Sequence, residues 1–109
     1  MARDTEWHFG PFRVEEGNER LWRGTEPIRL RPKSFAVLCY LLARACRLVT
    51  KAELLQTVWP EVVVSEAMLT ICISELRRAL GETRQAPACI ETVPRRGYRF
   101  VAPVTLVGP

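Results

Sequence analysis

Residues 65–81 read SEAMLTICISELRRALG, and this stretch is the most informative part of the sequence about the fold. Successive residues of an α-helix turn by about 100°, which places a set of apolar side chains on one side of the stretch. That side, which we expect to face the core, holds Leu69, Cys72, Ile73, Leu76 and Leu80. Ser65 is a good N-cap and Gly81 a good C-cap. The stretch therefore predicts a helix over residues 65–80.

The opposite side of this helix is small and polar, with one exposed aliphatic residue. It holds Ala67, Ile71, Ser74 and Arg78, flanked by Thr70, Glu75 and Arg77. Small side chains let a helix approach a DNA groove closely, and an isoleucine tip can touch a thymine methyl group. Thr70, Ser74 and Glu75 are candidates for hydrogen bonds to base edges. A solvated helix face explains the periodicity equally well.

A hairpin after the helix shifts that balance toward DNA. Residues 90–101 read IETVPRRGYRFV, which predicts two strands around a turn at 94–97. Its tip holds Arg95 and Arg96 side by side, with no acidic residue in the turn. A narrow groove with focused negative potential would attract such a pair. The alternative is a pair of arginines that water alone solvates.

The remaining elements lead up to this helix and hairpin. Residues 9–30 hold short apolar clusters separated by Gly, Asn and Pro, which predicts an antiparallel meander. A buried helix opens at Pro32 and is expected to end near Arg47. A second helix opens on a capping box of Thr50 and Glu53 and stops near Pro60. The fold class is therefore α+β, with strands, three helices and a hairpin in that order.

Phosphate groups should be held by residues that carry no sequence information. Lys51 lies at the start of the second helix, where free backbone N–H groups already favour an anion. Arg77 and Arg78 lie near the end of the third helix, where they serve equally well to complement the helix dipole.

Composition excludes several classes of protein. With 109 residues, 48% of them hydrophobic and 26% charged, the chain has room for one folded domain. We assign residues 1–104 to this domain and residues 105–109 to the start of a linker.

The four cysteines lack metal-ligand spacing, and the only histidine is His8, so we expect reduced thiols and no metal. No catalytic set of residues is apparent, so we expect no enzyme activity, cofactor or small-molecule substrate.

Charge is unevenly distributed along the chain. Residues 1–30 carry five Arg against six acidic residues, whereas residues 31–109 carry eleven Lys or Arg against six Glu. This asymmetry fits a polyanionic partner that is contacted mainly by the later part of the chain.

Taken together, these motifs resemble the OmpR/PhoB-type winged-helix transcriptional regulators, over roughly residues 7–104. The resemblance rests on LRPKSF at 30–35, VWP at 58–60, ISELRRALG at 73–81 and IETVPRRGYRF at 90–100. It implies an N-terminal four-stranded sheet, a three-helix core and a C-terminal hairpin wing. The helix at 65–80 would enter the major groove of double-stranded DNA, and the wing at 90–101 would contact the adjacent minor groove.

The resemblance also assigns roles to individual residues. Thr70, Ile71, Ser74 and Glu75 match groove-facing positions, and the tip arginines match the minor-groove contact. The positions that contact phosphate in the family correspond to Lys51, Trp59, Arg77, Thr92 and Tyr98. The loop at 60–64 matches the segment by which some members touch RNA polymerase, and members often bind DNA as head-to-tail pairs.

Because the DNA-binding motif begins close to Met1, the order of parts resembles the ToxR/CadC-like branch of the family. We therefore expect a cytoplasmic output domain of a bacterial regulator, and this order also fits the cytoplasmic domain of a longer protein that is membrane-anchored or has several domains. The alternative is a winged helix whose exposed face binds a protein instead of DNA, which the glutamates Glu66 and Glu75 favour.

Overall fold

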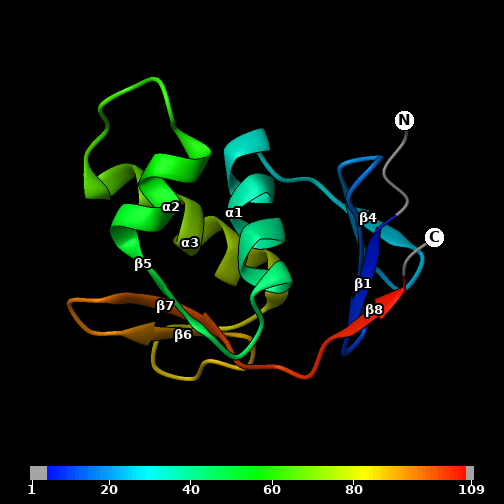
Figure 1. The fold of residues 1–109 in the computed structure, drawn as a ribbon. Coiled ribbons are helices and arrows are strands. Elements are labelled where there is room, and N and C mark those ends of the chain that lie inside the picture. The colour runs from blue at the N-terminus through cyan, green and yellow to red at the C-terminus, as the bar shows by residue number, and fades with distance from the viewer. Residues whose placement is uncertain (1–4, 108–109) are drawn as a thin grey trace.

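Two antiparallel sheets flank three helices in the computed structural model, which describes residues 5–107 (Figure 1). The helices are α1 (Pro32–Ala43), α2 (Lys51–Val58) and α3 (Glu66–Leu80). One sheet contains β1 (Glu6–Phe9), β2 (Phe12–Glu15), β3 (Arg20–Arg23), β4 (Glu26–Ile28) and β8 (Thr105–Val107). The other contains β5 (Leu48–Thr50), β6 (Ile90–Val93) and β7 (Gly97–Phe100), so that β6 and β7 form the predicted hairpin. The α+β winged-helix architecture predicted from the sequence is confirmed.

The first sheet has five strands, in the order β4-β3-β2-β1-β8. Its first four strands are the predicted meander, and the fifth is formed where the sequence suggested a linker. Thr105–Val107 pairs antiparallel with β1, so residues 105–107 belong to the sheet and residues 108–109 lie outside the described part. The added strand gives partners to backbone groups along the edge of β1. All three of its residues are exposed, so no buried alternation marked it as a strand.

The segment after α1 also departs from its predicted course. The helix ends at Ala43, four residues before the predicted end near Arg47. Cys46 then adopts a left-handed backbone conformation, with φ of 69°, and its N–H donates to the Phe100 carbonyl oxygen at 2.8 Å. This bond turns the chain so that β5 can pair with β7. A strand of three residues between two helices gave no periodic signal.

The ends of α2 and α3 realise the predicted capping in part. Thr50 Oγ1 accepts from the Glu53 N–H at 3.1 Å, but the Glu53 carboxylate binds the Tyr40 hydroxyl instead of returning to Thr50. Only one of the two hydrogen bonds of the capping box is formed, and the Glu53 carboxylate instead links α2 to Tyr40 of α1. Within residues 5–107, no side-chain hydrogen bond from Ser65 caps α3. Gly81 is the predicted left-handed C-cap, with φ of 73°.

The core runs without a break from one sheet to the other. Phe9 on β1 packs edge-on against Phe100 on β7, with ring centroids 5.0 Å apart. The same core includes the buried faces of the helices, among them Leu38 of α1, Leu54 of α2 and Leu69 of α3. Burying each such side chain contributes about 1.5–3 kcal/mol. This shared core fixes the hairpin relative to the helices.

Gly97 allows the hairpin to pack against β5. A Cβ atom at this position would lie 2.0 Å from the Val49 carbonyl oxygen and 2.9 Å from Thr50 Cα. Both neighbours are backbone atoms of the paired strand, so they cannot move aside without breaking the β5–β7 pairing.

We therefore expect Gly97→Ala to destabilise the domain by about 3 kcal/mol, near the upper end of overpacking costs. Gly24→Ala is the matched control, because Gly24 has a φ of +60° but open space around it. Its left-handed conformation should cost only about 1–2 kcal/mol. Urea denaturation of the two variants and the wild type measures both values. Equal losses would contradict the close approach at Gly97.

Candidate nucleic-acid interface

The third helix presents the face that its periodicity predicts. Its five predicted core residues are all buried, whereas Thr70, Ser74 and Arg78 are exposed and Ile71 is 44% exposed. The hydrogen bond from Thr70 Oγ1 to the Glu66 carbonyl oxygen, at 3.2 Å, keeps that side chain close to the helix. Short side chains therefore occupy the middle of the exposed face, as the sequence indicated.

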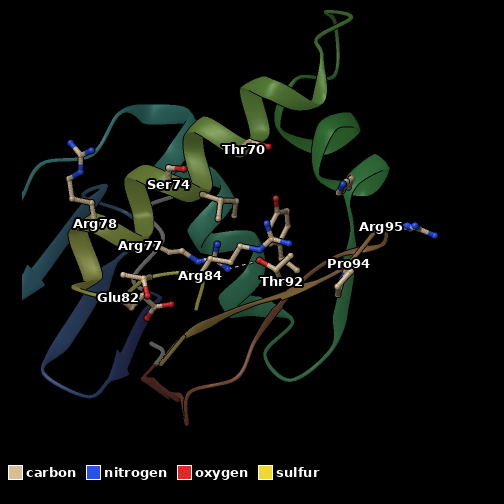
Figure 2. Close-up of a pocket in the computed structure, with 13 residues that line it drawn as sticks. Thr70, Ser74, Arg77, Arg78, Glu82, Arg84, Thr92, Pro94 and Arg95 are labelled. Carbon is tan, nitrogen blue, oxygen red and sulfur yellow. Dashed lines mark hydrogen bonds between the residues drawn. The ribbon is translucent and has the colours of Figure 1, made fainter. Parts of the chain in front are cut away.

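A groove of about 700 Å³ lies between α3 and the hairpin, and we call it the wing groove (Figure 2). It brings together eight of the twelve predicted site residues: Lys51, Thr70, Ser74, Arg77, Arg78, Thr92, Arg95 and Tyr98. The sequence did not single out Arg84, which also lines the groove from the loop between α3 and β6. Five cationic residues thus line one concave surface, with Glu82 as the one carboxylate in its lining.

Arg77 connects α3 to the hairpin. Its guanidinium group is buried, and Nη2 donates to the Ile90 carbonyl oxygen at 2.9 Å and to Thr92 Oγ1 at 2.7 Å. Burial lowers the pKa of this guanidinium, and the nearby Glu82 carboxylate opposes that effect. Figure 2 shows the side chain reaching from the helix toward Thr92. The first role of Arg77 is therefore to position the hairpin, although it also lines the wing groove.

Glu82 stabilises the far end of the same connection. Its carboxylate accepts from the Cys89 N–H at 2.8 Å and from the Ile90 N–H at 2.9 Å. Its own N–H donates to the Arg77 carbonyl oxygen at 2.9 Å, as in a helix C-terminal motif. Both oxygens of this buried carboxylate thus accept hydrogen bonds from the backbone that starts β6.

The tip of the hairpin is a tight turn that holds its arginines outward. The Arg96 N–H donates to the Val93 carbonyl oxygen at 3.0 Å, and Arg95 has a φ of 67°, as in a type II turn with Pro94 at its second position. The Arg96 carbonyl oxygen accepts from the Lys51 N–H at 3.1 Å, which ties the turn to the start of α2. Within residues 5–107, neither arginine side chain has an ion-pair partner.

Glu75 and Ile71 face away from the wing groove, toward the start of α1. The Glu75 carboxylate accepts from Ser34 Oγ at 2.6 Å and from the Arg31 N–H at 3.1 Å. Arg31 Nε lies 3.5 Å from the same carboxylate. Glu75 therefore caps α1. The helical wheel could not reveal this role, because it depends on residues more than forty positions earlier in the chain.

Trp59 and Arg96 are two further predicted site residues that lie outside the wing groove. Trp59 is buried at the end of α2, with Lys33 Nζ 6.0 Å from its ring centroid. Lys33 Nζ donates to the Val58 carbonyl oxygen at 2.8 Å, which fixes this cation over the ring. Arg96 is exposed at the hairpin tip. The roles that the resemblance assigns to both residues remain predictions.

Metal sites, reactive thiols and membrane-spanning helices are three further features to consider within residues 5–107. No group of three or more His, Cys, Asp or Glu side chains within residues 5–107 is placed to hold a metal ion. Burial raises the pKa of the Cys39 and Cys89 thiols to about 12, which makes them poor nucleophiles near neutral pH. No described helix combines the length and the apolar character that crossing a membrane requires.

A helix pair, α2 and α3, followed by a basic hairpin that packs on α3 defines the winged-helix class of domain. Residues 24–100 match the family model described as "Transcriptional regulatory protein, C terminal". The chain therefore belongs to this family of OmpR/PhoB-type DNA-binding domains of transcription regulators.

Individual relatives agree with this assignment. The chain is 43% identical over 89 residues to the transcriptional regulator HilA of Salmonella typhi, which is 82% of this chain and 16% of HilA. Its fold is similar to the DNA-binding domain of Escherichia coli CadC, with a TM-score of 0.82 and 27% identity over 97% of this chain and all of that one. The DNA-binding domain of Klebsiella pneumoniae RstA, solved in complex with the RstA box, has a TM-score of 0.77 and 26% identity, over 88% of this chain and 96% of that one. The chain thus spans about a sixth of the length of HilA.

Proposed function

We propose that this domain binds double-stranded DNA in a sequence-specific manner, with α3 in the major groove and the β6–β7 hairpin at the adjacent minor groove. One observation carries the proposal: the wing groove gathers Lys51, Arg77, Arg78, Arg84 and Arg95 along one side of a helix whose exposed face is small and polar. The DNA-binding domain of RstA, which has a similar fold and was solved in complex with the RstA box, supports DNA binding as such.

The two parts of the interface have different tasks. The middle of α3 offers Thr70, Ile71 and Ser74 to base edges, where hydroxyl groups hydrogen-bond and an aliphatic tip contacts a thymine methyl group. The exposed arginines Arg78, Arg84 and Arg95 would neutralise phosphates beside it, which supplies affinity without sequence information. Such a cluster of cations fits a polyanion and favours DNA over a protein surface that has no net negative charge.

The wing arginines provide the direct test. We expect Arg95→Ala with Arg96→Ala to weaken binding to all DNA sequences and to lower the slope of log K against log salt by about 2. The fold should be unaffected, since the turn is held by the backbone groups of Val93, Arg96 and Lys51. Fluorescence anisotropy with a labelled duplex at several KCl concentrations measures both quantities.

Arg23→Ala with Arg47→Ala is the matched control for that test. Both arginines are exposed and lie outside the lining of the wing groove, so the net charge changes equally. The control should keep nearly the full salt slope. If the wing variant bound as tightly as the wild type across the salt series, the minor-groove assignment would be wrong.

We further propose that the domain is the output part of a bacterial transcription regulator and binds DNA as a head-to-tail pair. Selection of bound duplexes from a random pool should then return one motif as a direct repeat, with centres about 10 bp apart. A direct repeat is expected because a head-to-tail contact joins two different surfaces, whereas a two-fold symmetric pair would select an inverted repeat. A single unrepeated motif would contradict pairing and leave monomeric DNA binding intact.

The loop between α2 and α3 is the proposed contact for RNA polymerase. It extends beyond the helices in Figure 1, and within it Val62 is 61% exposed and Val63 is fully exposed. Neighbouring exposed aliphatic side chains of this kind mark surfaces that partners cover. No wing-groove residue comes from this loop, so it remains accessible beside the groove.

We expect Val62→Ser with Val63→Ser to leave DNA affinity unchanged and to abolish a supershift of the protein–DNA complex by bacterial RNA polymerase holoenzyme. Val101→Ser is the control, because Val101 is an exposed valine at the end of the hairpin. A gel-shift assay with a selected duplex measures both effects. An unchanged supershift would show that polymerase does not recognise the loop.

A further inference from the structure

A second groove lies on the other side of α3, between this helix and the extended linker that joins β4 to α1. We call it the linker groove; its volume is about 560 Å³. Arg29 and Arg31 line it from the linker, and Ile71 lines it from the helix. Thr70, Ser74 and Arg78 line both the linker groove and the wing groove. The exposed face of α3 is therefore a ridge with a cationic groove along each side.

The linker holds its two arginines toward solvent by a simple alternation. In an extended chain, successive side chains point to opposite sides. Ile28 and Leu30 are partly buried and pack against the core, whereas Arg29 and Arg31 between and after them are exposed. Arg31 has the extended backbone angles φ −67° and ψ 151°. Two anchored apolar residues thus fix the backbone from which both guanidinium groups extend.

The charge of the linker groove is positive despite the presence of Glu75. Both oxygens of that carboxylate accept hydrogen bonds at the start of α1, from Ser34 Oγ and from the Arg31 N–H. It therefore occupies the N-terminus of α1 and leaves the arginines as the groups able to bind an anion. Within residues 5–107, Arg29 and Arg78 have no ion-pair partner, and the Arg31 side chain is 70% exposed.

A helix in the major groove of DNA has one sugar–phosphate backbone on each side, because that groove is about 12 Å wide and is bordered by both strands. The wing groove accounts for one of these strands. We propose that the linker groove binds the other strand, with Arg29 and Arg31 each holding a backbone phosphate. The planar guanidinium group suits this task, since it can donate two parallel hydrogen bonds to a phosphate. This inference rests on the proposed function and adds a second site of contact to it.

The experiment uses the whole chain and a labelled 30-bp duplex that carries a single binding motif selected from a random pool. Arg29→Gln with Arg31→Gln should reduce the salt slope by about 1.8, since each lost phosphate contact removes about 0.9. Between 50 and 200 mM KCl, wild-type affinity should then fall about tenfold more than that of the variant. Arg23→Gln with Arg47→Gln is the charge-matched control and should keep the wild-type slope.

A strand-resolved measurement separates a direct contact from a general loss of charge. Ethylation of single phosphates should interfere with wild-type binding on both strands that border the recognised major groove. The Arg29 and Arg31 variant should lose interference on one strand, and the Arg95 and Arg96 variant should lose it on the opposite side. Because Arg31 also pairs with Glu75, Arg29→Gln alone serves as a second variant, with an expected slope change of about 0.9.

Three outcomes would overturn the inference. An unchanged salt slope with interference retained on both strands would show that the linker arginines do not touch DNA. A defect limited to paired binding on a duplex with two motifs, with single-motif binding intact, would assign the linker groove to contact between two copies of the chain. If the wild-type chain did not bind the duplex at any salt concentration, both the proposed function and this inference would be wrong.

Discussion

The interface depends on one buried interaction, in which the Arg77 guanidinium group of α3 donates to the Ile90 carbonyl oxygen and to Thr92 Oγ1 on β6. An arginine side chain keeps its charge at any ordinary pH, so burying it is costly unless acceptors meet it. The Ile90 carbonyl oxygen and Thr92 Oγ1 come within hydrogen-bonding distance of Arg77 only when the hairpin packs against α3. The cost of burying Arg77 thereby couples the position of β6 to that of α3.

Two backbone constraints extend this coupling to the tip of the hairpin. Gly97 brings β7 so close to β5 that a methyl group would not fit, and the Arg96 carbonyl oxygen accepts from the Lys51 N–H at the start of α2. The hairpin is thus held at its base, along its length and at its turn. The backbone that carries Arg95 and Arg96 is held by these bonds, which reduces the conformational entropy lost when a ligand binds. A preorganised cation pair suits a narrow groove, where a displaced guanidinium group would lose its contact.

Features that depend on residues close together in the chain could be predicted from the sequence, and features that depend on distant residues could not. The α3 face, the Gly81 cap and the hairpin are local, since each is specified by residues within one turn or one strand of each other, and all three are present. The features that escaped prediction depend on distant partners. Glu53 turns to Tyr40 instead of completing its capping box, and Glu75 caps a helix that precedes it by about forty residues. β8 exists because β1 offers an open edge, and nothing within residues 105–107 signals that pairing.

The cations around α3 and the uncharged middle of its exposed face are structurally separate. Within the described residues, the cations around α3 come from separate elements: the β4–α1 linker, the start of α2, the loop after α3 and the hairpin tip. The residues at the middle of the ridge, Thr70, Ile71 and Ser74, carry no charge. Substitutions there leave the surrounding cations and the Arg77 connection untouched, because neither depends on those three side chains. If the domain binds DNA as proposed, base preference can therefore change without loss of affinity for the phosphate backbone or of stability, provided that Glu75 remains to hold α1.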